Sequence, residues 1–319
     1  MSAPTAPARP RRAASSPDAA RTGRASFRRR RRVGRGLIVW GFLLPALLLF
    51  AYFKFIPMGT GIQMSFHDVR PFLGDVWVGF ANYAEVLTDP RYADAIWHTV
   101  LLGVGSSVGA VIGGVVLALV LEGGSRFLWF VRTAAFLPVV TATAVIAEVW
   151  RIIYFPAADG YLNSLVGALG IGPVGWLTDP DTALGAVMAV GIWQGAPYNM
   201  VIILAGLAGV DRSLYEAAAI DGANVWQRLR HIVIPALRPA LTIVIILAAI
   251  RALRVFTDVW VLTGGGPSGA TDVWMTRTYS LGFERNELGV AAAASIILLV
   301  ITVAITLGAA AALRRRKDA

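Results

Sequence analysis

Six apolar stretches, each about 20 residues long, constrain this chain more than any other feature. A helix of that length spans the roughly 30 Å hydrocarbon core of a bilayer. Only 15% of the residues are charged and 56% are hydrophobic, whereas soluble domains average about 25% charged residues. We therefore expect an all-α, polytopic membrane protein with six transmembrane helices, at residues 37–56, 96–121, 132–154, 183–210, 240–262 and 288–313.

The fifth stretch carries three ionisable residues. Such groups are costly inside a membrane and are candidates for function by default. Arg251, Arg254 and Asp258 are spaced i, i+3 and i+7, so a continuous helix would place them on one face. Two structural explanations also stand: an ion pair between Arg254 and Asp258, or one between Arg251 and Glu148.

The second stretch has glycine and serine at helical spacing. Small residues four apart let two helices approach closely. We expect this face to be a helix-packing surface, which by itself indicates no particular function. It comprises Gly103, Gly105, Ser106, Ser107, Gly109, Gly113 and Gly114.

The net charge of +10 comes from the N-terminal tail. Residues 1–35 hold eleven arginines and one acid, so 11 − 1 = +10, and the rest of the chain is neutral. With few large apolar residues the tail cannot bury enough surface to fold, so we expect a disordered basic segment rather than a nucleic-acid-binding face. The first apolar run is too long for a signal-peptide core and is expected to remain as an uncleaved span.

Basic residues in short loops predict the orientation of the spans. With six spans, the tail, the turn after the second span, the loop at residues 211–238 and the basic end at 314–319 all lie on one side. Both termini should therefore face the cytoplasm of a bacterial inner membrane. The transmembrane domain would cover residues 36–313, with the loop 211–238 as a cytoplasmic segment within it.

That loop should form two helices around a glycine. Asp211 and Ser213 are good N-cap residues for the first helix, and Gly222 can end it with a left-handed backbone. The second should run from about Asn224 and stop before Pro235. One face is small or apolar and the other is charged. Such a segment could lie on lipid headgroups or insert into a groove of another protein.

The spacing within this loop resembles the EAA signature of ATP-binding-cassette importer permeases. Isoleucine stands where that signature usually has leucine before its proline. The resemblance implies that the loop docks on an ATPase subunit and acts as a lever, with Gly222 as its sharp turn. The implied coupling residues are Glu216, Ala217, Ala218, Asp221, Gly222, Ile232 and Pro235. Glu216 and Asp221 would contact the ATPase, or pair locally with Arg212 and Arg228.

The resemblance extends from about residue 35 and is specific in two places. The residues around Gly222, and the run from Val261 to Pro267, are typical of carbohydrate permeases of the MalF type and of glycerol-phosphate importers. It implies four partners: a second, MalG-like permease, a dimeric ATPase, an extracytoplasmic solute-binding protein and membrane lipid. The chain has no phosphate-binding loop, so we expect no cofactor on it, with ATP and magnesium on the ATPase, and no enzyme activity of its own.

A solute path between the paired permeases is also implied. Aligned by motif, the family's sugar-contacting positions point to Val139, Thr143, Gly191, Gln194, Gly195, Arg251 and Val255. Sugars need hydrogen-bonding groups and aromatic faces, which adds Trp193, Tyr198 and Asn199, while Arg254 and Asp258 enter as ionisable groups. Gly191, Gly195 and Pro197 are expected to loosen the fourth helix.

The sequence therefore favours a sugar permease subunit, for an oligosaccharide, a disaccharide or a related solute. A permease of the same superfamily for a non-sugar solute is the first alternative. A secondary transporter would need inverted repeats with broken helices, which the sequence does not display. A membrane enzyme would need clustered histidines or carboxylates. The chain has no cysteine and three scattered histidines, so we expect no metal site.

Overall fold

The computed structural model describes residues 40–70, 72–252 and 255–317 and is mostly helical. The predicted tail at 1–35, residue Arg254 and the last two residues lie outside this range. The chain divides into two units, one ending at Thr60 and the other beginning at Gly61. A helix covers Trp40–Met64 and includes a π-helical turn, η1 (Ala51–Phe55), followed by α2 (Ile56–Met64).

Three long helices of the second unit correspond to predicted spans: α4 (Pro90–Val120), α8 (Pro180–Leu207) and α15 (Leu288–Lys317). The first two start alike, because an aspartate caps each N-terminus and a proline follows it. Asp89 accepts from the Arg91 N–H at 3.0 Å, and Asp179 from the Asp181 N–H at 2.9 Å. Among the described residues, four helices are long and apolar enough to cross a membrane, or six if each of two bent pairs is one span.

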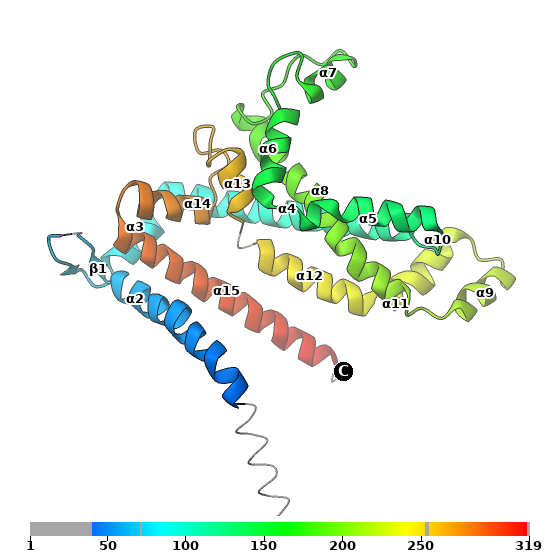
Figure 1. Cartoon of the computed structure of the whole chain (residues 1–319), viewed down its shortest axis with the longest axis horizontal. Helices are drawn as coiled ribbons and strands as arrows, with labels where there is room; N and C mark the ends of the chain where they lie inside the picture. Colours follow the sequence, from blue (N-terminus) through cyan, green and yellow to red (C-terminus); the bar gives the residue numbers. More distant parts are fainter. Residues whose placement is uncertain (1–39, 71, 253–254, 318–319) are drawn as a thin grey trace, which may run out of the picture. The chain divides into compact units, whose positions relative to one another are not determined.

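The predicted helix-packing face is confirmed. α4 lies against α8, and α12 (Arg238–Ala252) packs on both (Figure 1). A Cβ added to Gly109 would lie 2.4 Å from the Ile192 side chain, and one on Gly114 would lie 2.6 Å from Asn199 Cβ. The glycines therefore set how closely α4 and α8 approach.

The expectation that glycine and proline loosen the fourth span is wrong. α8 is one continuous helix through Pro197. A Cβ on Gly191 would lie 3.0 Å from Ser106 Oγ, and one on Gly195 would lie 2.8 Å from Ala110 Cβ. These glycines serve close packing against α4.

The third and fifth predicted spans are broken. α5 (Arg126–Val140) and α6 (Thr143–Ile153) meet at 102°, because Thr141 and Ala142 adopt extended backbone angles. Beyond α12, the chain leaves the helix and re-enters one as α13 (Thr257–Leu262), which packs on α6 and α8. A second bend, of 68°, separates α12 from the helical stretch Val225–Ala236.

Short elements complete the second unit. Two-residue strands β1 (His67–Asp68) and β2 (Val76–Trp77) pair antiparallel. The remaining helices are α3 (Ala81–Thr88), α7 (Tyr161–Gly167), α9 (Arg212–Ile220), α10 (Val225–Arg228), η2 (Leu229–Val233), α11 (Ile234–Ala236), α14 (Trp274–Tyr279) and η3 (Ser280–Glu284). The predicted basic end at 314–319 continues α15 as far as Lys317.

Candidate functional site

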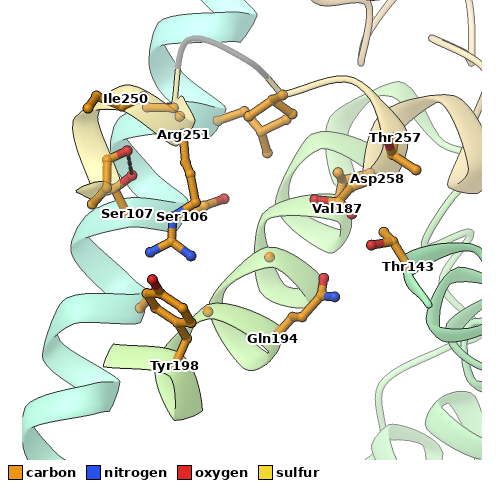
Figure 2. Close-up of a pocket in the computed structure, with 18 of the residues that line it drawn as sticks. Ser106, Ser107, Thr143, Val187, Gln194, Tyr198, Ile250, Arg251, Thr257 and Asp258 are labelled. Carbon is orange, nitrogen blue, oxygen red and sulfur yellow. Dashed lines mark hydrogen bonds between the residues drawn. The ribbon is translucent and has the colours of Figure 1, made fainter. Parts of the chain in front are cut away.

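An open cavity of about 630 Å³ lies where the broken helices meet the α4–α8 pair. We call it the central cavity. Its walls come from α4, α8, the end of α12, the start of α13 and the bend between α5 and α6 (Figure 2). Because the helices break at this level, polar side chains from five segments converge on one space.

Most of the residues predicted for a solute path line the central cavity. These are Val139, Thr143, Gly191, Gln194, Gly195, Tyr198, Asn199, Arg251, Val255 and Asp258. Trp193 is not among the lining residues: it is 45% exposed and meets Trp150 edge-to-face at 5.5 Å. Arg254 lies outside the described residues. The structure thus gathers these side chains, and their role in transport stays a prediction.

Arg251 sits at the end of α12 and reaches across to α8. Its guanidinium lies over the Tyr198 ring, 4.6 Å from the centroid, and donates to Asn199 Oδ1 at 3.4 Å. The suggested pairing of Arg251 with Glu148 is wrong, since Glu148 pairs with Arg151 at 3.0 Å. Stacking on the ring holds the cation while leaving its edge free to donate hydrogen bonds.

Asp258 comes from a different helix than Arg251. The prediction that the two share one helical face is wrong, because α12 ends at Ala252 and α13 begins at Thr257. Asp258 lies in the first turn of α13, where the positive end of the helix dipole favours a carboxylate. Figure 2 shows Asp258 on the side of the cavity near Thr143, and Arg251 on the side near Tyr198.

Sequence reasoning missed several lining residues, among them the polar or aromatic Ser106, Ser107, Phe256 and Thr257. The two serines were assigned to helix packing, and Ser107 does donate to the Ala248 carbonyl at 3.2 Å. Phe256 and Thr257 become lining residues only because the chain breaks before them. Their position in the sequence, five to six residues beyond Arg251, did not predict that the helix breaks there.

The coupling segment, residues 211–238, contains the predicted helix–glycine–helix. Asp211 caps α9 by accepting from the Ser213 N–H at 2.9 Å. Gly222 follows with φ +71°, the left-handed value expected of it. Asn224 then caps α10 in a reciprocal capping box with Gln227.

The end of this segment differs from the prediction. The helical path does not stop before Pro235 but continues through η2 and α11. The π-helical turn of η2 directly precedes α11, and the missing N–H of Pro235 falls in the first turn of α11, where no intrahelical bond is required. Ile232 and Pro235 therefore lie in the connection to α12.

The coupling segment has one packed and one open face. Tyr215, Leu229 and Val233 pack against the ends of α4 and α8. Burial raises the pKa of the Tyr215 hydroxyl. The open face carries large apolar side chains beside exposed carboxylates, namely Leu214, Glu216, Ile220, Asp221, Val225 and Trp226.

The predicted local salt bridges of this segment are not seen within the described side chains. The Arg228 Nε donates to the Ala223 carbonyl at 3.1 Å instead of pairing with a carboxylate. Glu216 and Asp221 form no ion pair with the side chains that the structure describes. The side chain of Arg212 lies outside the described part of the chain, so its predicted pairing stays a prediction.

A buried ion pair joins α14 to the start of α4. Arg277 Nη2 donates to Asp89 Oδ2 at 2.9 Å, and the arginine also lies over the Tyr92 ring at 5.9 Å. Burial opposes ionisation of Asp89. The hydrogen bonds from the Arg91 N–H and the Arg277 guanidinium outweigh it, so the pKa of Asp89 lies below its ordinary value. This pair anchors α14, the element that follows the glycine-rich loop.

Comparison with known proteins agrees with this arrangement. The chain is 35% identical over 262 residues to the probable ABC transporter permease protein YurN of Bacillus subtilis, covering 81% of this chain and 89% of the relative. It is 34% identical over 234 residues to the trehalose/maltose transport system permease protein MalF of Thermococcus litoralis, covering 72% and 78%.

Solved structures match over almost the whole fold. A chain of a bacterial ABC transporter that imports the acidic polysaccharide alginate superposes with a TM-score of 0.79 and 27% identity, covering 90% of this chain and 99% of that one. A second alginate transporter structure, in complex with an alginate-pentasaccharide-bound periplasmic protein, gives 0.77 and 25%, covering 89% and 96%. A family sequence model matches residues 108–318. The chain therefore belongs to the binding-protein-dependent transport system inner membrane components, the membrane-embedded permease subunits of ABC importers.

Proposed function

We propose that this permease subunit forms half of the translocation pathway for a sugar in a heteromeric, ATP-driven importer. The observation that carries the proposal is the lining of the central cavity. Thr143, Gln194 and Asp258 offer hydroxyl, amide and carboxylate groups, and Tyr198 offers an aromatic ring. A sugar needs such hydrogen-bonding partners together with apolar faces. An oligosaccharide, a disaccharide or a related solute fits this description.

Two relatives support the sugar assignment. One is named a trehalose/maltose permease, and another belongs to an importer of the polysaccharide alginate. Other relatives carry only the name of a probable permease, so the sugar itself is open. The residues inferred for the path are those of the central cavity, and Trp193 is now expected to act only in packing.

The proposed topology has six spans within residues 36–313 and both termini in the cytoplasm. The bent pair α5–α6 would form the third span, and α12 with α13 the fifth. The coupling segment then lies on the cytoplasmic side, continuous with the basic loops. Its open face, with Glu216, Asp221 and Gly222 at the turn, would dock on a dimeric ATPase that holds ATP and magnesium.

Three further partners follow from this proposal. A second, MalG-like permease would close the open side of the central cavity. An extracytoplasmic binding protein would deliver the solute, as the alginate-bound periplasmic protein in the related complex suggests. Lipid would cover the remaining apolar faces. As a permease, the chain is a transport subunit rather than a catalytic one.

Uptake of a panel of radiolabelled sugars tests the proposal. A strain lacking this gene should lose uptake of one sugar and regain it with the wild-type gene. Gln194→Leu in the complementing gene should reduce that uptake while the protein still reaches the membrane. Unchanged uptake of every sugar, with loss of amino-acid or ion uptake instead, would refute the sugar assignment.

A further inference from the structure

The Arg251 guanidinium and the Asn199 amide lie beside each other at one end of the central cavity. We propose that these two residues form a subsite for a carboxylate, so that the transported sugar is an acidic one. The inference rests on the proposed function and names its substrate class. Three features of the described residues carry it.

The first feature is the free edge of the Arg251 guanidinium. A guanidinium has five N–H donors, and the described contacts use one of them in a 3.4 Å bond to a neutral amide. The Tyr198 ring covers one face of the cation and leaves the edge open. No described carboxylate lies within ion-pair distance of Arg251. That edge matches a carboxylate, which accepts two parallel hydrogen bonds from it.

The second feature is an unpaired amide on the cavity wall. Asn199 is 0% exposed, and its Nδ2 has no hydrogen-bond partner among the described residues. Its Oδ1 faces Arg251, which fixes the orientation of the amide. This N–H is itself buried, so a ligand reaches it only when the cavity wall shifts; because a buried N–H without a partner is costly, an acceptor that does reach it gains from the contact. Asn199 packs beside Gly114, where a Cβ added to the glycine would lie 2.6 Å from Asn199 Cβ, so α4 limits its movement.

The third feature is the separation of charge across the cavity. Asp258, Thr143 and Gln194 lie together on the other side (Figure 2). Asp258 would accept hydroxyl protons of a sugar and repel a carboxylate. A solute with a carboxylate at one end and hydroxyls at the other is thereby held in one orientation. A neutral sugar would leave both the guanidinium edge and the Asn199 amide without a partner, and sites built to hydrogen-bond a group discriminate against analogues lacking it.

A matched pair of sugars tests this inference. The permease is reconstituted in lipid vesicles with its partner permease, ATPase and binding protein. ATP-driven uptake is then measured for a uronate-containing disaccharide, its neutral counterpart and the corresponding sugar phosphate. We expect the uronate to be taken up about ten-fold faster than the neutral sugar. Preference for the sugar phosphate would overturn the carboxylate assignment.

The decisive variant is Asn199→Asp. It is close to isosteric, and it places a carboxylate beside Arg251 that competes with the carboxylate of the solute. We expect uptake of the uronate to fall about ten-fold more than uptake of the neutral sugar. If Arg251 and Asn199 only join α8 to α12, the substitution strengthens their contact and leaves uptake of the uronate unchanged, which would overturn the proposal.

Variants of Arg251 give a second measure. Arg251→Lys keeps the charge but cannot donate two parallel hydrogen bonds to a carboxylate, so it should retain part of the uronate uptake. Arg251→Gln should lose that uptake. Arg151→Gln, at an exposed pair outside the cavity, is the control and should behave as wild type. Co-purification with the partner subunits shows that each variant assembles. If the wild-type protein takes up only neutral sugars, the acidic substrate class is wrong but the proposed function as a sugar permease still holds. If it takes up no sugar at all, both proposals are wrong.

Discussion

The tight approach of α4 and α8 gives a graded prediction about stability. In the variant Gly114→Ala, the new Cβ would lie 2.6 Å from Asn199 Cβ, 3.0 Å from the Ala196 carbonyl oxygen and 3.1 Å from the Met200 nitrogen. Carbon atoms pack at about 3.5–4.0 Å, so the helices must separate by roughly 1 Å. Two of the three obstructing atoms are backbone, so no side-chain rotation relieves the clash.

Two matched variants separate this clash from the general effect of alanine. Gly185, on the partner helix α8, has open space where a Cβ would stand, with no atom within 4 Å, so Gly185→Ala should gain up to about 1 kcal/mol from helix propensity. Gly105→Ala meets only the flexible end of Met188 at 2.5 Å, which can move away. Overpacking costs about 1–3 kcal/mol, so Gly114→Ala should be the least stable of the three.

Thermal unfolding of the purified complex measures the ranking. We expect midpoints in the order Gly185→Ala, Gly105→Ala, Gly114→Ala, from highest to lowest. Solute uptake should also fall in Gly114→Ala, because the displaced Asn199 lines the central cavity. If Gly114→Ala unfolds at the same temperature as Gly185→Ala, the glycines do not set the distance between these helices.

Three further predictions concern separate parts of the molecule. Gly222→Val should leave membrane insertion intact but abolish solute-stimulated ATPase activity, because φ +71° is strained for a branched side chain by about 1–2 kcal/mol; normal uptake would refute the lever role. Asp89→Asn should lower the unfolding temperature, since it leaves the 8% exposed Arg277 without its carboxylate, which costs about 1–3 kcal/mol for a pair partly open to water. The pKa of Asp89 in the folded protein lies below the ordinary 3.8. The difference in stability between wild type and Asp89→Asn should therefore have its full size well above pH 3.8 and vanish as the pH falls through the folded pKa. A stability difference that already disappears at neutral pH would contradict this. Trp193→Ala should leave the concentration dependence of uptake unchanged while Gln194→Ala weakens it, and the reverse result would place Trp193 in the path.

Composition and hydropathy predicted the helical class and the long helices. α4, α8 and α15 follow from apolar runs with clear boundaries, because length and hydropathy are properties of the local sequence. The helix–glycine–helix of the coupling segment was equally predictable from the sequence. Its caps and its left-handed glycine depend on residues within a few positions of one another.

The breaks in the third and fifth helices could not be predicted from the sequence. Thr141 and Ala142 have extended backbones that neighbouring residues do not require, and Val255 and Phe256 lie outside a helix although neither is a glycine or proline. Packing of α13 against α6 and α8 holds the second half of the broken helix. A hydropathy profile gives one apolar stretch in each case, because it averages the residues on both sides of the break.

By itself the sequence determined the permease class, the spacing of the coupling segment and most of the residue types of a polar site. Only the tertiary structure decided that Arg251 and Asp258 come from different helices and face one cavity from opposite sides. It also decided that Asn199 lies in the cavity wall with a buried, unpaired donor and that Trp193 does not line the cavity. The physical reason is that helical spacing fixes which residues share a face only while the helix continues. Once it breaks, the neighbours of a side chain are set by packing between segments far apart in the chain.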